Sequence, residues 1–370
     1  MNGQQQQPLR HVVIGVGAIV FEAHRPGITS ERSQIVGVCD IREDAARERA
    51  AEFGCPWYLD YREMLAEQHP DVAVVTTPHY LHAEMAIACL RAGCHVLVEK
   101  PMALEVAEAD AMVDAQAEAK RLLAVVFQHR HRPEVRAARR LIRQGRIGEI
   151  QRLRMIASWP RTERYYAMAT WRATWWGEGG GVLMNQSPHD LDLVCHLMGA
   201  PSRVAAWTQT RVHKIEVEDT ASAMLEWPNG ATGFLHMTTA EGKTNSEVEI
   251  IGTGGILSIG QGTLSFQEFE TDAKRFLLET DEIWRGPALH PVEVELEAGE
   301  GNHAAVYRNL HAAILDGTPL GSDGREGRNS LELANAINYS SHLRSEVTLP
   351  IDRARYSEFL AELKRGSTRR

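Results

Sequence analysis

The stretch that decides the fold reads HVVIGVGAI, residues 11–19. Its β-branched apolar start predicts a buried strand. Gly15-Val16-Gly17 then predicts a tight turn into an apolar helix, where backbone N–H groups and the helix N-terminus can approach a pyrophosphate. The third glycine position of such a motif is Val20 here. Alone, the motif fits either a dinucleotide site or an ordinary turn between a strand and a helix.

An acidic residue at the end of the second predicted strand strengthens the dinucleotide interpretation. Asp40 closes residues 35–40. A carboxylate at this position binds the ribose 2′-hydroxyl and repels a 2′-phosphate, so the sequence favours NAD over NADP. Arg42 works against that preference, because a guanidinium there could pair with the extra phosphate.

Short β-branched runs alternate with helical patterns over the first third of the chain, which is typical of repeated βαβ units. The runs are nearly continuous in apolar residues, as in strands buried on both faces. They span residues 11–15, 35–40, 71–77, 95–100 and 122–128, and the helices between them start near Ala18, Arg42, Tyr61, Leu81 and Glu105. We therefore predict an α/β fold, with a Rossmann domain of doubly wound parallel sheet over residues 1–132.

The pattern changes after Pro133. Glycine-containing turns at 228–230 and 252–255 predict two hairpins, and hence a large, mainly antiparallel open sheet. We predict a C-terminal α+β domain for substrate binding and oligomerisation over residues 133–370. Its other predicted elements are helices at 133–144, 304–315 and 330–341 and strands at 150–159 and 202–212.

Composition argues against several classes of partner. A net charge of -9 disfavours nucleic acid, and the arginines of residues 133–144 lie opposite an apolar helix face, as on a solvated surface. The polar N-terminus and the lack of a long apolar run favour a soluble, cytoplasmic protein without a membrane partner. Five scattered cysteines fit reduced thiols. The pairs His129/His131 and His189/His196 lack zinc-type spacing, so we expect no metal.

Several motifs occur in an order shared with a known family. They are GVGAI (15–19), Asp40, TPHYLH (77–82), AGCHVLVEKP (92–101), GRIGE (145–149), Trp171-Arg172, GGGVLMNQSPHDLDL (179–193) and DGREGRNSLELANAI (323–337). Over about residues 11–350 the chain resembles the glucose-fructose oxidoreductase, inositol dehydrogenase and MocA (Gfo/Idh/MocA) family. The resemblance implies that Lys100 and His189 line one active site beside the nicotinamide. The family often has aspartate where Asn185 stands here, a variation associated with its sugar-processing branches.

Chemical reasoning leads to the same two residues. Oxidation of a carbinol requires a group that removes the hydroxyl proton, and an imidazole ordinarily titrates near neutrality. We assign His189 as general base or acid, and Lys100 as an electrostatic partner or proton relay. The opposite assignment stays open. Asp192, on the same predicted helix as His189, either orients its ring or has a structural role, and the structural role is favoured.

The remaining candidate site residues fall into two groups. The cofactor group comprises Gly15, Gly17, Ala18, Ile19, Asp40, Arg42, Thr77, Pro78, His79, His82, Glu99, Lys100, Pro101, Gln128 and Arg172. The substrate group comprises Asn185, Arg172, Trp171, Tyr165 and Trp176. Its aromatic residues read as part of a loop, where they could bind a sugar, form a small core of their own or contact a second subunit. Arg161, Arg164 and Arg172 could bind a substrate carboxylate or phosphate.

These features together predict an NAD(P)-dependent oxidoreductase that transfers hydride between the nicotinamide and a secondary hydroxyl or ketone of a sugar, glycoside or cyclitol. Two alternatives stay open: redox-assisted glycoside cleavage with tightly bound NAD, and a non-catalytic NAD-binding sensor. An open sheet in the second domain would expose a broad face, so we expect a homodimer or homotetramer.

Overall fold

The computed structural model describes residues 7–244 and 246–367, with the side chains of residues 18–20 excluded. These residues form two compact units. The first extends to Gln128 and is completed by Asn302–Leu331; the second comprises His129–Gly301 and the residues from Glu332 onward. The sequence prediction divides the chain between residues 132 and 133 and leaves Asn302–Leu331 in the second domain. No helix in the described ranges has the length and hydropathy needed to cross a bilayer.

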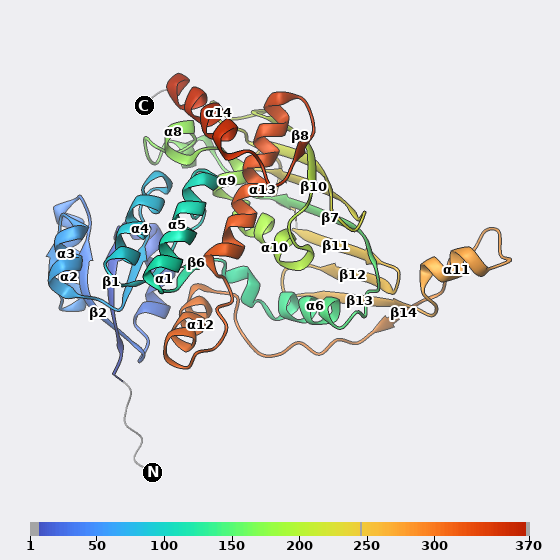
Figure 1. Cartoon of the computed structure of the whole chain (residues 1–370), viewed down its shortest axis with the longest axis horizontal. Helices are drawn as coiled ribbons and strands as arrows, with labels where there is room; N and C mark the ends of the chain where they lie inside the picture. The colour runs from blue at the N-terminus through green and yellow to red at the C-terminus, as the bar shows by residue number, and fades with distance from the viewer. Residues whose placement is uncertain (1–6, 245, 368–370) are drawn as a thin grey trace, which may run out of the picture. The chain divides into compact units, whose positions relative to one another are not determined.

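A six-stranded parallel sheet forms the first unit (Figure 1), which confirms the predicted parallel sheet and adds the short strand β3 to the five predicted runs. Its strand order is β3-β2-β1-β4-β5-β6. The order reverses between β1 and β4, and open sheets of this kind bind ligands beyond the carboxyl ends of the strands at such a point. The strands are β1 (Leu9–Ile14), β2 (Ser33–Cys39), β3 (Trp57–Tyr58), β4 (Val72–Val75), β5 (His95–Val98) and β6 (Leu123–Val125).

Helices connect these strands, and a late helix joins them. The connecting helices are α1 (Ala18–Ile28), α2 (Glu43–Phe53), α3 (Tyr61–Gln68), η1 (His79–Leu81), α4 (His82–Arg91) and α5 (Val106–Ala119). The late helix α12 (His303–Leu315) packs against α1. Gly27 makes this packing possible, because a Cβ there would come within 2.2 Å of the Tyr307 ring. Tyr307 and its neighbours Val306 and Leu310 belong to the core under the sheet.

A nine-stranded sheet forms the second unit, in the order β14-β13-β12-β11-β7-β10-β9-β8-β15 (Figure 1). All its pairs are antiparallel except β7 with β10, so the predicted mainly antiparallel sheet is confirmed. Its strands are β7 (Ile150–Ser158), β8 (Arg203–Gln209), β9 (Thr220–Glu226), β10 (Thr232–Thr238), β11 (Glu247–Gly252), β12 (Gly255–Ile259), β13 (Leu264–Phe269), β14 (Leu289–Val292) and β15 (Val347–Thr348).

The remaining helices include several that the sequence reading missed. They are η2 (Gln128–His131), α6 (Pro133–Arg143), α7 (Glu163–Tyr166), α8 (Trp175–Glu178), α9 (Val182–Asn185), α10 (Pro188–Met198), α11 (Ala273–Glu279), α13 (Gly324–Leu343) and α14 (Arg353–Gly366). The predicted aromatic loop contains the one-turn helices α7 and α8. A single turn is too short to show helical periodicity, which explains the difference.

Candidate functional site

The glycine turn after β1 leaves room for a ligand. Gly15 has φ +89°, and a Cβ there would lie 3.0 Å from the backbone of Thr76, so this position requires glycine. A Cβ on Gly17, at the N-terminus of α1, would meet no atom within 4 Å. This open space in front of a helix N-terminus is what a pyrophosphate requires. The predicted contacts of the Ala18 and Ile19 side chains lie outside the described residues.

Asp40 follows β2, and its carboxylate holds the glycine turn. Oδ2 accepts the Val16 N–H at 3.0 Å, and Oδ1 accepts the Arg42 N–H at 2.9 Å. The Arg42 side chain is exposed, with Nε 3.5 Å from Asp40 Oδ1. Asp40, which favours NAD, and Arg42, which would favour NADP, are therefore neighbours. Of the two side chains, the Asp40 carboxylate is the one fixed beside the glycine turn.

His82 ties together the loops after β4 and β5. Its Nδ1 lies 2.8 Å from the Pro101 carbonyl oxygen, and its Nε2 lies 2.7 Å from the Thr77 carbonyl oxygen. Burial lowers the pKa of this fully enclosed imidazole, although both carbonyls favour its charged form. His82 thus fixes the backbone on both sides of the site, at Thr77 and at Pro101 next to Lys100.

The predicted cofactor residues follow successive strands of the first unit. Thr77 and Pro78 follow β4 and are partly buried, whereas His79 is buried in η1. Lys100 follows β5 and is partly buried, and Gln128 begins η2 after β6. Glu99 is buried, with its carboxylate bonded to His24 and His303. The sequence reading did not connect Glu99 with these two histidines.

In the second unit, His189 stands at the start of α10, partly exposed. Its ring centroid lies 4.6 Å from that of His129. Next to His129 in the chain, Arg130 forms a buried two-point ion pair with Asp192: Nε to Oδ2 is 2.8 Å, and Nη2 to Oδ1 is 2.6 Å. Asp192 therefore binds Arg130, which agrees with the favoured structural role.

Four predicted substrate residues belong to one cluster. The Tyr165 hydroxyl donates to Asn185 Oδ1 at 3.1 Å and accepts from Arg172 Nη1 at 2.7 Å. The Arg172 guanidinium lies over the rings of Tyr165 and Trp171. Trp176 lies on α8 and is partly buried. The cluster presents amide, phenol and guanidinium groups beside aromatic faces, a combination suited to a polyhydroxylated ring.

The sequence reading missed Glu178 in this cluster. The Glu178 side chain is 1% exposed, bonds Asn185 Nδ2 through Oε1, and accepts the Ala173 N–H through Oε2 at 2.6 Å. Its Oε1 also lies 3.6 Å from Arg172 Nη1. The positive charge of Arg172 is thus balanced inside the protein. An acidic residue between tryptophans and the glycine run, in WWGEGGG, was the signal available in the sequence.

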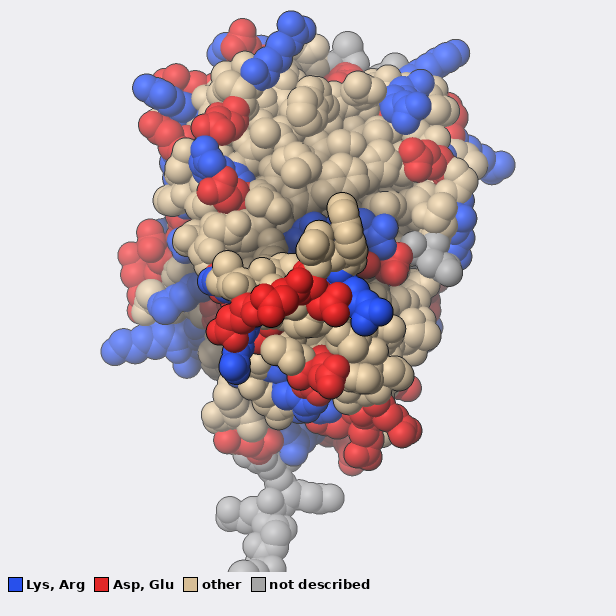
Figure 2. All heavy atoms as spheres, turned by 90° about the vertical axis from the view of Figure 1, so that its right-hand side faces the viewer, with Lys and Arg blue, Asp and Glu red and all other residues tan. Residues whose placement is uncertain are grey.

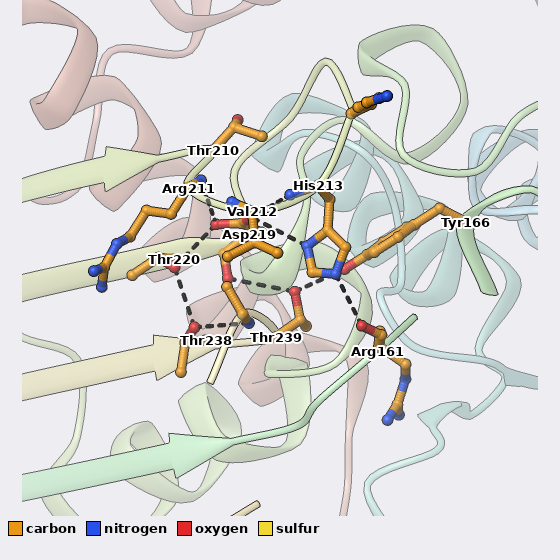
Figure 3. A network of polar contacts seen from close by, with 12 residues as sticks. Arg161, Tyr166, Thr210, Arg211, Val212, His213, Asp219, Thr220, Thr238 and Thr239 are labelled. Carbon is orange, nitrogen blue, oxygen red and sulfur yellow. Dashed lines mark hydrogen bonds and ion pairs between the residues drawn. The ribbon is translucent and has the colours of Figure 1, made fainter. Parts of the chain in front are cut away.

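A polar network centred on Asp219 anchors the aromatic segment to the sheet (Figure 3). Asp219 accepts the backbone N–H groups of Arg211, Val212 and His213. Burial disfavours the charged carboxylate, but these donors hold its pKa below the usual value. The His213 ring bridges Asp219 Oδ2 at 3.0 Å and the Arg161 carbonyl at 2.8 Å. This bridge fixes the start of the segment that carries Tyr165.

Glu218 holds the other end of the cluster and predicts a pH dependence. Its Oε1 accepts the N–H groups of Gly181 and Leu183, at the start of the helix that carries Asn185. Burial raises its pKa to about 7 from 4.5. The folded state thus binds this proton more tightly than the unfolded state. The stabilisation is complete below about pH 4.5 and is lost as the pH rises through 7.

We expect Glu218→Gln to remove this loss, because glutamine resembles the protonated acid. Urea unfolding at pH 5 and pH 8 measures it. The decrease in unfolding free energy between the two pH values should be roughly 2.5 kcal/mol larger in the wild type than in the variant. Equal decreases in both proteins would contradict the prediction.

Both units match models of known protein families. A family model described as "Oxidoreductase family, NAD-binding Rossmann fold" matches residues 9–127. One described as "GFO/IDH/MocA C-terminal domain" matches residues 135–258. The chain belongs to the Gfo/Idh/MocA oxidoreductase family. The resemblance predicted from the motifs is therefore confirmed.

Similar Gfo/Idh/MocA proteins include enzymes with different substrates. The WlbA dehydrogenase from Bordetella pertussis, solved with NADH and UDP-GlcNAcA, is 30% identical, with a TM-score of 0.79 over 93% of this chain and 100% of that one. Levoglucosan dehydrogenase from Pseudarthrobacter phenanthrenivorans is 28% identical, over 85% of this chain and 89% of that one. Myo-inositol 2-dehydrogenase from Thermotoga maritima is 23% identical, over 92% and 98%.

Proposed function

We propose that this chain is an NAD-dependent dehydrogenase that interconverts a secondary hydroxyl and a ketone on an uncharged sugar, glycoside or cyclitol. The observation that carries the proposal is the set of groups beyond the carboxyl ends of the parallel strands. The open glycine turn follows β1, Asp40 follows β2 and Lys100 follows β5. Names of relatives that act on levoglucosan and myo-inositol support the substrate class.

The residues present fit NAD. The open position at Gly17 admits the pyrophosphate, and the fixed Asp40 carboxylate suits a ribose with a free 2′-hydroxyl. Bound NAD would supply the hydride acceptor. The ion pair between Arg172 and the buried Glu178 supports an uncharged substrate over a sugar acid, since Glu178 already offsets the arginine's charge.

Acid–base chemistry in this proposal rests on His189 and Lys100. His189 takes the hydroxyl proton, while Lys100 stabilises the developing alkoxide or relays the proton. The reverse assignment is the alternative. Their meeting at one active site stays a prediction, because Lys100 belongs to the first unit and His189 to the second.

The test is NADH formation at 340 nm, with NAD and NADP supplied separately and a panel of inositols, aldoses, glycosides and sugar acids. Turnover with NAD on one uncharged group supports the proposal. Turnover confined to sugar acids contradicts the substrate class. No net NADH from glycosides, together with aglycone release by protein that retains NAD, would instead support redox-assisted cleavage.

We also propose a homo-oligomer built on the open sheet of the second unit. Trp207, Met224 and Phe234 on adjacent strands β8, β9 and β10 are 64%, 48% and 38% exposed. Figure 2 shows a broad area over this part of the sheet without charged side chains. Such a patch is typical of a subunit interface. Light scattering should give a mass two or four times the 41.2 kDa of one chain. Trp207→Glu should lower the measured mass toward that of a single chain. A monomeric wild type would contradict the proposal.

A further inference from the structure

Three side chains from distant parts of the first unit converge on one point. His24 comes from α1, Glu99 follows β5, and His303 begins α12. The Nε2 atoms of His24 and His303 lie 2.9 Å and 3.3 Å from the same carboxylate oxygen, Glu99 Oε1. One nitrogen or oxygen from each residue lies within 4.8 Å of the others. Two imidazoles and a carboxylate therefore face a common centre.

The charge at this point is negative and enclosed. The Glu99 side chain is 11% exposed and that of His24 is 1% exposed. Although burial favours the neutral acid, the two imidazoles hold the Glu99 pKa well below its usual value. Burial lowers the pKa of His24, which favours a neutral ring. Within the described ranges, the Glu99 carboxylate bonds to the two imidazoles and to the Lys100 backbone N–H and pairs with no Lys or Arg side chain, so a bound cation would balance its charge.

Neighbouring groups orient these side chains as outer-shell groups orient metal ligands. The Tyr307 hydroxyl lies 3.0 Å from His24 Nδ1, which directs Nε2 toward Glu99. Glu99 Oε2 accepts the Lys100 backbone N–H at 3.1 Å, which leaves Oε1 for the centre. Gly27 lets Tyr307 approach α1 closely enough for this contact. Metal-binding histidines characteristically have such a partner on the second ring nitrogen.

We infer that His24, Glu99 and His303 form a binding site for a divalent transition metal, with zinc the best match. Zinc bonds of 2.0–2.2 Å in a tetrahedron place neighbouring ligand atoms roughly 3.3–3.6 Å apart. The 3.3 Å separation between His303 and Glu99 fits this range, and the 2.9 Å separation between His24 and Glu99 would lengthen slightly when the ion binds. Two imidazoles with one carboxylate suit zinc rather than magnesium or calcium, which prefer oxygen ligands. A fourth position remains for water.

The bound ion would link α1, the end of β5 and α12. Its binding energy would stabilise the first unit, because the unfolded chain does not bring the three ligands together. Protons on the Nε2 atoms must leave when the metal binds, so affinity should fall as the pH is lowered. The site uses first-unit residues only and does not depend on the proposed dehydrogenase activity.

Isothermal titration of the full-length chain with ZnCl₂ tests the inference, after removal of any tag histidines and of metal by chelator. One zinc ion per chain should bind, and His303→Gln and His24→Gln should each weaken the affinity by about 30-fold or more. His311→Gln is the matched control. His311 also lies on α12 and pairs with another buried histidine, His11, at 3.1 Å, so its replacement should leave zinc affinity unchanged.

Cobalt(II) provides a second readout. Tetrahedral cobalt should give intense visible absorption bands in the wild type and in His311→Gln, and none in His303→Gln. Because His24 is fully buried, the result for His24→Gln counts only if its circular dichroism spectrum matches that of the wild type. If the spectra differ, the partly exposed His303 provides the test, through His303→Gln. Equal zinc affinity in the wild type and His303→Gln, no binding at all, or loss of binding only in His311→Gln would overturn the inference.

Discussion

Replacing Lys100 with methionine should lower kcat on the best substrate of the panel by about a thousandfold. Methionine keeps much of the side-chain length and removes the charge that would stabilise the developing alkoxide. His189→Ala should have a similar effect, because a positioned acid–base group contributes about 10²- to 10⁴-fold. The double variant should lose little more than either single variant, since the two groups act on one proton transfer.

Steady-state kinetics with NADH fluorescence measures this, and NAD binding should persist in both variants. Lys214→Ala and His236→Ala are the controls. Lys214 is exposed, and His236 lies on β10. Turnover within a few-fold of the wild type in both Lys100→Met and His189→Ala would contradict the assignment. If only one of the two variants loses activity, the acid–base chemistry belongs to the residue replaced in that variant.

Asp192→Ala should lower the free energy of unfolding by about 3–5 kcal/mol, because it leaves the Arg130 guanidinium buried without its carboxylate. The Arg130 side chain is 3% exposed and that of Asp192 is 0% exposed, so water cannot replace the missing carboxylate. The same change should reduce kcat, since Arg130 adjoins His129, whose ring packs on His189.

Urea unfolding and kinetics on the same preparation test both expectations. The double variant Arg130→Met/Asp192→Leu should recover most of the stability, because it removes both buried charges. The exposed pair Arg275–Glu279 is the control, and its loss should leave the unfolding midpoint unchanged. A similarly small effect of Asp192→Ala would show that Arg130 finds another partner.

Local sequence was sufficient for every strand of the first unit except β3, and for the residues that follow those strands. Asp40 and Lys100 could be placed because each directly follows a short apolar run, and parallel strands bring such ends to one edge. Glu178 was not predicted because its partners Asn185 and Arg172 come close to it only once the short helices α8 and α9 have folded. The short strands β3 and β15 have too few residues to show alternation.

Contacts across long sequence separations were out of reach for a similar reason. The sequence near Glu99 does not predict its bond to His303, since that contact depends on where α12 packs. The expectation of no metal rested only on histidine pairs that are near one another in the chain. The three residues proposed here are joined by tertiary structure alone.

The return of Asn302–Leu331 to the first unit has a consequence for synthesis on the ribosome. Val306, Tyr307 and Leu310 complete a core whose other members emerge far earlier. At about 5–20 residues per second, the nascent chain waits roughly ten to forty seconds after residue 128 before this segment is translated. During that interval the α1 surface that receives Tyr307 is uncovered and available to chaperones. The first unit therefore cannot complete its core until most of the second unit has been translated.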